Sequence, residues 1–344
     1  MKIQDQILTI LSINGVLSSS EIQEKLGDSS SRSSVKRTLT LLVDKKLIDR
    51  LGKGRSTQYK LSDSYQILHS IDLEKYFEKE IDERIIQGNF NFKLLQEDLY
   101  KVDIFTETEL KKLAALQDIY TRNIAQLSEL EYDKEIERLA IDLSWKSSQI
   151  EGNTYTLLET ERLLKEQKTA SGKLKDEATM LLNHKDAIDF IVEHPDYLHQ
   201  LSVRSIEDIH SLLVKELGVS RNLRTRRVGI TGTNYKPLDN EFQIREAFRE
   251  MCTLLNAKQN VFEKALLVLV LISYIQGFKD GNKRTARIVS NSILIANKHC
   301  PISFRTVDSI DYKKAMLIFY EQNNITAFKR IFIDQFEFAV NTYF

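Results

Sequence analysis

Apolar side chains recur along the first part of the chain at the spacing of amphipathic helices, and then change to the alternation of strands. The predicted elements are helices at 3–13, 18–26 and 32–46, followed by strands at 47–51 and 57–61. Ser18 and Glu21 stand three positions apart and predict a capping box at the start of the second helix. Three short helices followed by a hairpin with a glycine-rich turn predict a winged helix over residues 1–62.

Positive charge is concentrated in this head. Residues 1–61 contain seven Lys and four Arg against four Asp and two Glu, a net charge of +5, whereas the whole chain has a net charge of zero. In a winged helix the third helix can enter the major groove while the wing lies along the phosphates. The residues expected to contact DNA are Arg32, Ser33, Lys36 and Arg37 on the third helix, and Lys53 and Arg55 on the wing. Winged helices also dock proteins and pair with one another, so a protein partner and a homodimer stay open as alternatives.

The rest of the chain is predicted to be mainly α. Only 3 Pro and 12 Gly interrupt a composition rich in good helix formers. We expect a helical connector over residues 63–130 and a second domain over 131–344. The N-terminus reads as an amphipathic helix rather than a signal peptide, the longest apolar run is too short to span a bilayer, and Cys252 and Cys300 are too few for a disulfide framework. These features predict a soluble cytoplasmic protein with no membrane partner.

The most apolar run, residues 264–276, predicts a buried helix, and a second buried helix is expected from Thr285 to about Asn297. The turn between them is rich in Gly, Asn and basic residues. Gly281 and Asn282 tolerate unusual backbone angles, so that successive N–H groups can face one concavity. The second helix adds its positive N-terminal end. This pattern predicts an anion site, although an ordinary basic surface loop would have the same composition.

The charged residues of the turn fit a phosphate group accompanied by a metal ion. Arg284 and Arg287 stand three positions apart at the start of the second helix, so both can reach the same anion as bidentate donors. A carboxylate next to such an anion needs a cation between them. Asp280 is therefore expected to hold Mg²⁺, which binds one or two carboxylates together with phosphate oxygens.

Residues 276–287, called the motif segment below, resemble the central motif of the Fic family, His-Pro-Phe-x-Asp/Glu-Gly-Asn-Gly/Lys-Arg-x-x-Arg. The matching residues are Phe278, Asp280, Gly281, Asn282, Lys283, Arg284 and Arg287, while Gln276 stands at the histidine position and Gly277 at the proline position. Residues 222–237, called the flap segment, look like the family's β-hairpin flap. Ser147, Glu151 and Gly152 look like its inhibitory motif, Ser/Thr-x-x-x-Glu-Gly/Asn. The resemblance places an inhibitory helix at 139–152 and the core at about 201–340.

The resemblance implies an all-helical Fic core with a β-hairpin flap, and transfer of AMP from ATP to a hydroxyl group of a target protein. It implies that the ATP phosphates are bound by Gly281, Asn282, Lys283, Arg284 and Arg287. It further implies that Asp280 binds Mg²⁺, that Glu151 inhibits by pairing with Arg287, and that Ser147 bonds near the anion site. The flap residues implied to clamp a target by strand addition are Gly229, Ile230, Thr231, Gly232, Thr233 and Tyr235.

Gln276 departs from the pattern at the catalytic position. A carboxamide cannot take up a proton near neutral pH, so it can orient a hydroxyl group but cannot act as a general base. Loss of general-base help lowers a rate by about 10²–10⁴-fold. The histidines outside the motif, such as His184 and His210, are expected to be solvated or core residues. Three hypotheses remain: a self-inhibited AMP-transferase with impaired catalysis, a nucleotide-sensing transcriptional regulator with a silent Fic core, and a transferase with another phosphate donor.

Overall fold

The first domain is a winged helix. The structure, a computed structural model, describes residues 3–27, 30–62 and 64–344. The elements of this domain are α1 (Ile3–Asn14), β1 (Leu17–Ser18), α2 (Ser19–Leu26), α3 (Arg32–Asp44), β2 (Ile48–Leu51) and β3 (Gln58–Leu61). Strand β3 pairs antiparallel with both β1 and β2, so that Tyr59 lies opposite Leu17 on one side and Arg50 on the other. The predicted winged helix is confirmed, with the two-residue strand β1 as an addition that the apolar pattern did not predict.

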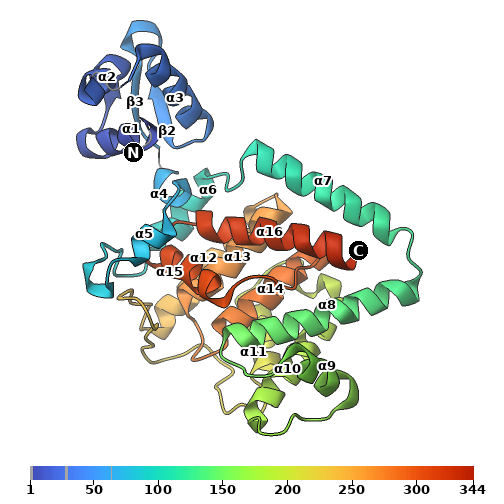
Figure 1. Cartoon of the computed structure of the whole chain (residues 1–344). Coiled ribbons are helices and arrows are strands. Elements are labelled where there is room, and N and C mark those ends of the chain that lie inside the picture. The colour runs from blue at the N-terminus through green and yellow to red at the C-terminus, as the bar shows by residue number, and fades with distance from the viewer. Residues whose placement is uncertain (1–2, 28–29, 63) are drawn as a thin grey trace.

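The head has a hydrophobic core of its own, built from the apolar faces of its helices and the start of β2. The fully or nearly fully buried side chains include Ile7, Leu11, Ile22, Val35, Leu39, Leu42 and Ile48. The predicted capping box is present, since Ser18 Oγ accepts a hydrogen bond from Glu21 N and Glu21 Oε2 accepts one from Ser18 N at 2.7 Å. Figure 1 shows the head at one end of the molecule, joined to the helical body through the connector.

The connector contains only short elements before α7, in contrast to the helical connector that the periodicity predicted. They are α4 (Tyr65–Leu68), α5 (Leu73–Phe77), a 3₁₀ turn (Ile81–Glu83), a π-helical turn (Leu94–Asp98), α6 (Leu99–Lys101) and then α7 (Glu107–Ile124). No part of residues 64–105 keeps an apolar face over several turns, and the buried residues instead enter the core of the body one or two at a time. Helix α4 touches both cores, because Tyr65 packs on the core of the head and Ile67 lies in that of the body.

The body is a helical domain built around α13 and α14. Its elements are α8 (Glu129–Ile150), α9 (Leu157–Glu166), α10 (Lys175–Glu193), a 3₁₀ turn (Pro195–Leu198), α11 (Val203–Leu213), α12 (Glu241–Ala257), α13 (Val261–Ile275), α14 (Asn282–Ala296), α15 (Ser309–Gln322) and α16 (Thr326–Tyr343). Helices α13 and α14 pack on each other at the centre, and α8, α10, α11, α12, α15 and α16 surround them (Figure 1). Every side chain from Phe262 to Ile275 other than Lys264 is buried, which confirms the predicted buried helix.

Two sequence predictions in the body are corrected. Helix α14 begins at Asn282, three residues earlier than predicted, because Gly281 with φ +81° turns the chain directly into the helix. The flap segment has no strand pair; its backbone is irregular with a turn at Thr231 and Gly232. The guanidinium of Arg224 donates hydrogen bonds to the carbonyl groups of residues 226 and 238. These bonds join the two arms of the segment in place of a backbone ladder.

Among the described residues, no helix is both long enough and apolar enough to cross a membrane.

Candidate functional site

The motif segment is a tight turn between two buried helices. Helix α13 ends at Ile275 and is followed by Gln276 in the left-handed conformation, with φ +51°, while α14 starts after Gly281. Asn282 closes the turn with its side chain: its Oδ1 accepts from Phe278 N at 2.9 Å and its Nδ2 donates to Phe278 O at 2.8 Å. Asn282 itself has helical geometry, so the prediction of an unusual backbone angle there is wrong. Its side chain holds the loop, and only its backbone N–H is left to face an anion.

Basic side chains converge on the start of α14. Arg284 and Arg287 are 1% and 0% exposed, and Lys283 is 24% exposed in its side chain. Arg284 donates to Leu213 O and to Asp280 Oδ2, both at 3.2 Å. The buried Nε of Arg284 and Nη1 of Arg287 have no hydrogen-bond partner in the structure. Unpaired buried donors are costly, so a group with several acceptor oxygens would be stabilised at this place.

Asp280 fits the role of a ligand to a metal ion that accompanies such a group. Its side chain is 61% exposed, its Oδ1 accepts from Gly281 N at 2.6 Å, and its Oδ2 contacts Arg284. The described residues contain no group of three or more His, Cys, Asp or Glu side chains that could hold a metal by themselves. A single exposed carboxylate beside a helix N-terminus suits Mg²⁺, which takes few protein ligands together with phosphate oxygens and water.

Gln276 is held inside the turn by its own amide. Its Nε2 donates to Ser273 O at 2.7 Å, and its Oε1 accepts from Asn282 Nδ2 at 3.1 Å. Its backbone carbonyl accepts from Arg224 Nε at 2.5 Å. The hydroxyl group of Tyr320 lies 3.4 Å from Nε2, and burial raises the pKa of this phenol, so it stays protonated. None of these groups around Gln276 is a base near neutral pH.

Gly277 is required by packing. A Cβ atom at this position would lie 2.0 Å from Cε2 of Phe248, which is fully buried. We expect Gly277→Ala to lower the free energy of unfolding by about 1–3 kcal/mol, the usual effect of overpacking a core. Urea denaturation would measure this, with Gly229→Ala as the control because a Cβ there meets nothing within 4 Å. Equal urea midpoints for the two variants would contradict the steric explanation.

Helix α8 brings Ser147 and Glu151 onto the motif segment. Arg287 donates from Nε to Ser147 Oγ at 2.7 Å, and from Nη2 to Ser147 O and Glu151 Oε1, both at 3.0 Å. Lys283 Nζ lies 3.3 Å from the other oxygen of Glu151. The α8 helix ends at Ile150, and Gly152 with φ +101° turns the chain away. The carboxylate of Glu151 thus contacts Arg287 and Lys283, two of the basic residues predicted from the sequence to bind an anion.

The charge of Glu151 is maintained by its partners. Burial by itself would raise the pKa of this carboxyl, but the positive charges of Arg287, Lys283 and Arg284 outweigh burial and hold the pKa below its ordinary value. The carboxylate is therefore ionised at neutral pH. A bound anion and this carboxylate would compete for the same guanidinium group.

Two histidines that sequence reasoning treated as background lie at the site. His184 on α10 is fully buried, and its Nε2 is 2.5 Å from Ser147 Oγ, the atom that accepts from Arg287. His210 on α11 stacks on Phe278 with 3.7 Å between ring centroids, and its Nε2 is 3.0 Å from Asp280 O. No local signal in the sequence marks either residue, because each reaches the site only through the packing of its helix.

His184 predicts an acid dependence of stability. Burial, together with the charges of Arg287 and Arg284, lowers the pKa of His184 from 6.5 to about 3. The unfolded chain binds a proton between these pH values that the folded chain does not, so the free energy of unfolding falls as the pH drops below about 6.5. Between pH 7 and pH 5 this one group contributes a loss of about 2 kcal/mol.

We therefore expect His184→Asn to lose about 2 kcal/mol less than the native chain over this interval. Urea midpoints at the two pH values would measure it. His199→Asn provides the control, because it makes the same substitution at an exposed histidine. An equal pH dependence in His184→Asn and the native chain would contradict the assignment.

The flap segment differs from its predicted role at its base. Tyr235 is 3% exposed, stacks on Tyr274 and donates to Tyr274 O at 3.1 Å. It is therefore a core residue and not part of a docking surface, because its ring fills space beneath the segment. Gly229 and Thr231 are exposed, whereas Ile230, Gly232 and Thr233 are half-buried. Other exposed positions lie on both arms of the segment, at 225–227 on one side of the turn and at 234 and 236 on the other.

Five of the six residues predicted to contact DNA are exposed on the head. Arg32, Ser33, Lys36 and Arg37 are exposed on α3, and Lys53 is exposed between β2 and β3. The side chain of Arg55 lies outside the described part of the structure. Helix α3 is capped by Ser31 Oγ, which accepts from Ser34 N at 3.2 Å and leaves the basic face uncovered.

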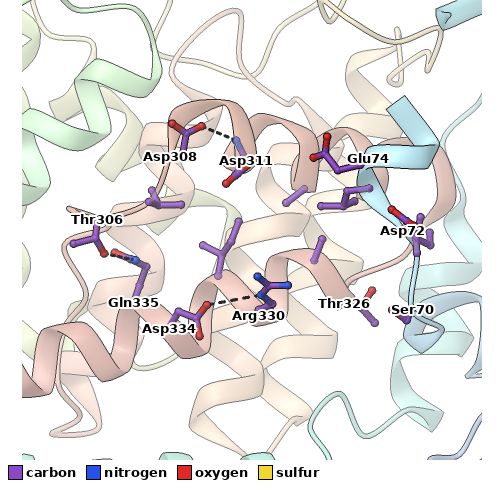
Figure 2. Close-up of a pocket in the computed structure, with 16 residues that line it drawn as sticks. Ser70, Asp72, Glu74, Thr306, Asp308, Asp311, Thr326, Arg330, Asp334 and Gln335 are labelled. Carbon is purple, nitrogen blue, oxygen red and sulfur yellow. Dashed lines mark hydrogen bonds and ion pairs between the residues drawn. The ribbon is translucent and has the colours of Figure 1, made fainter. Parts of the chain in front are cut away.

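A cavity of about 690 Å³ lies between the connector, the start of α15 and α16, and it contains none of the motif residues. Figure 2 shows its polar lining, in which Asp72 and Glu74 from the connector face Asp308 and Asp311 at the start of α15 and Arg330 and Asp334 on α16. The carboxylates outnumber the single arginine. This lining does not suit a phosphate group, so the cavity is not an extension of the candidate site.

The fold and the site together define a mainly helical protein with a tight turn, lined by basic side chains, between two buried helices. Residues 200–294 match the Fic/DOC family and residues 2–104 match the penicillinase repressor family. The motif segment lies within the part that matches the Fic/DOC family, and the winged helix lies within the part that matches the penicillinase repressor family.

Relatives agree with this assignment. The protein adenylyltransferase Fic of Nematostella vectensis is 29% identical over 177 residues, which cover 49% of this chain and 40% of the relative. The structure of Fic-1 from C. elegans has a TM-score of 0.59 at 19% identity, covering 69% of this chain and 72% of that one. A Fic domain containing signaling protein from Bacteroides thetaiotaomicron has a TM-score of 0.57 at 18% identity, covering 69% and 94%. The structural likenesses show the fold.

Proposed function

We propose that the Fic domain binds ATP with Mg²⁺ at the motif segment and transfers AMP to protein hydroxyl groups, that Glu151 inhibits it, and that Gln276 makes the transfer slow. The observation that carries this proposal is the contact of Glu151 and Ser147 with Arg287. In a self-inhibited phosphate site, a carboxylate of the same chain pairs with the basic residue that would otherwise bind the phosphate, and Glu151 is in this position beside Arg287. The adenylyltransferase name of a relative supports the reaction class.

Each residue has a role in this proposal. The N–H groups at the start of α14 and the unpaired donors of Arg284 and Arg287 bind phosphate oxygens. Asp280 holds Mg²⁺, which would neutralise phosphate charge. Gln276 orients the incoming hydroxyl group through its amide and takes no proton from it. Glu151 must leave Arg287 before the terminal phosphate can pair with that guanidinium group.

Calorimetry with ATP and Mg²⁺ tests the proposal. Glu151→Gly is expected to bind ATP about 5–150-fold more tightly than the native chain, because coupling between two sites usually changes an affinity by a factor in this range. The control is Gln167→Gly, which makes the same kind of change at the C-terminal cap of α9, away from the motif segment. Equal affinities of Glu151→Gly and the native chain would refute inhibition by Glu151, and no binding by either would refute the nucleotide site.

A second function is supported by the head. Its match to the penicillinase repressor family and the exposed basic face of α3 favour DNA binding. In this alternative the protein is a transcriptional regulator that senses a nucleotide through a catalytically silent Fic domain. ATP binding without labelling of any protein would separate it from the transferase.

DNA binding is expected to weaken with salt, because each phosphate contact contributes a slope of about −0.9 in a plot of log affinity against log salt. Fluorescence anisotropy with random duplex DNA would measure this slope for the native chain and for Lys36→Ala. We expect Lys36→Ala to make the slope less steep by about 0.9, the contribution of one phosphate contact. Lys175→Ala on α10 removes the same charge from the Fic domain and should leave the slope unchanged. A salt-insensitive signal would contradict the role of the head.

A further inference from the structure

The connector lies along the flap segment. Lys236 N donates to Gly88 O at 2.9 Å, and Asn89 and Lys236 form an isolated parallel bridge. Asn234 Nδ2 donates to Asp82 Oδ1 at 2.8 Å. One backbone donor of the flap segment is therefore already taken by the chain itself. A target that adds as a strand cannot use this position.

Arg84 is at the centre of the contact. Its side chain is 5% exposed, and it donates from Nη1 to Glu321 Oε1 at 3.0 Å and from Nη2 to the carbonyl group of Gly232 at 3.2 Å. Gly232 has φ +90° and forms the turn of the flap segment. Arg84 thus joins the connector, α15 and the flap turn through one planar group.

The partners of Arg84 are fixed in turn. Glu321 is 1% exposed and also accepts from Tyr76 OH at 2.7 Å. Gln322 Nε2 donates to Tyr76 OH at 3.0 Å and to Ile85 O at 2.6 Å. The guanidinium of Arg84 also lies over the ring of Phe77, 5.2 Å from its centroid. The position of the charged group is therefore determined from several sides and does not depend on the flap segment.

Stacked aromatic rings connect the connector and the flap segment to residues near the motif segment. Phe90 of the connector and Tyr235 of the flap segment both stack on Tyr274, with centroids 4.8 and 5.0 Å away. Asn91 N donates to Tyr274 OH at 2.9 Å. Tyr235 also stacks on Tyr320, the residue whose hydroxyl group lies near Gln276. The connector therefore supports the same residues that support the base of the flap segment.

We propose that the connector is a built-in frame for the flap segment, and that Arg84 is the positioning residue that fixes the flap turn for an incoming target. The inference rests on the proposed transfer to a protein target and on the target-docking role that the family resemblance implies for the flap segment. At the flap turn itself, Gly229 and Thr231 are the exposed positions that a target can meet. The frame is continuous with α4, which packs on the core of the winged helix.

Arginine is needed at this position because its planar group has several donors with fixed directions. Lysine would keep a positive charge beside Glu321, but its single nitrogen cannot also hold the carbonyl group of Gly232 in this geometry. Arg84→Lys in the full chain is therefore the informative variant, while Arg84→Met also leaves Glu321 buried without its cation. Arg227→Lys is the matched control. Arg227 lies in the flap segment, forms an ion pair with Asp239, and has a side chain that is 86% exposed.

Hydrogen exchange of the backbone amides of residues 229–236 tests the frame. Arg84→Lys is expected to exchange about tenfold faster there, the effect of losing one hydrogen bond from a charged donor, with exchange in α13 unchanged. Arg227→Lys should leave both regions as in the native chain. Unchanged exchange at 229–236 in Arg84→Lys overturns the proposal.

Self-labelling with ATP labelled at the α-phosphate tests positioning, in a chain that also carries Glu151→Gly and Gln276→His. Arg84→Lys should lower kcat about tenfold while the KM for ATP stays within about twofold, since only the acceptor is displaced. A variant with both a lower kcat and a raised KM for ATP would indicate general damage to the site, and would overturn the role of Arg84 as a positioning residue. If the parent chain does not label itself, the proposed transferase function fails, and hydrogen exchange alone decides whether Arg84 holds the flap turn.

Discussion

Gln276→His in a Glu151→Gly background is expected to raise the rate of AMP transfer by about 10²–10⁴-fold over Glu151→Gly alone. Histidine tolerates the left-handed conformation better than most residues, so the φ of +51° at this position is not an obstacle. Imidazole also titrates near neutral pH and can take the proton of the attacking hydroxyl group.

Incorporation of label from ATP into protein would measure the rates. Gln276→Asn in the same background is the control, because it keeps a carboxamide and supplies no base. Strong labelling by Glu151→Gly alone would show that the native glutamine already supports catalysis. No gain on introducing histidine would show that proton removal does not limit the rate.

Arg287→Met is expected to lower the free energy of unfolding by up to about 3–5 kcal/mol, the usual result of removing one partner of a buried ion pair. Arg287 is fully buried, makes three hydrogen bonds to α8 and lies over the ring of Tyr312 at 5.3 Å. Without it, Glu151 keeps only the more distant Lys283. Methionine preserves most of the side-chain volume of arginine. The decrease in the free energy of unfolding therefore measures the loss of the charge and of its hydrogen bonds.

The same variant should bind ATP with Mg²⁺ at least about tenfold more weakly, since a charge-assisted hydrogen bond to phosphate is lost. Urea denaturation and calorimetry would measure the two effects. Arg287→Met combined with Glu151→Gln should recover stability and not binding, because it removes the unpaired carboxylate but restores no donor. Recovery of both would show that Arg287 does not contact the nucleotide.

The turn of the motif segment could be predicted from the sequence because its conformation depends on residues close together in the chain. Gly281, the N-terminal turn of α14 and the spacing of Arg284 and Arg287 are local properties. The winged helix was predictable for the same reason, since capping residues and apolar spacing specify its short elements. The start of α14 was missed by three residues because the turn residues themselves adopt helical geometry.

The flap segment shows where local patterns are insufficient. The family resemblance predicted a β-hairpin here, yet Arg224 forms side-chain hydrogen bonds across the segment and Tyr235 turns into the core. The connector was assigned no chemistry, although Arg84 contacts a carboxylate 237 positions away. Periodicity reports whether a face is buried and does not report which partner buries it.

The sequence by itself determined the helical class, the winged helix, the turn between two buried helices, and that position 276 carries glutamine and no histidine. Each depends on residue type and short-range spacing, which fix backbone conformation and the chemistry of a side chain. Only the tertiary structure decided that Ser147 and Glu151 lie on Arg287, that His184 touches Ser147, and that Arg84 holds the flap turn. Glu151 and Arg287 are 136 positions apart, and their contact exists because α8 packs against α14. Such contacts depend on how helices pack, which the spacing within any one helix does not specify.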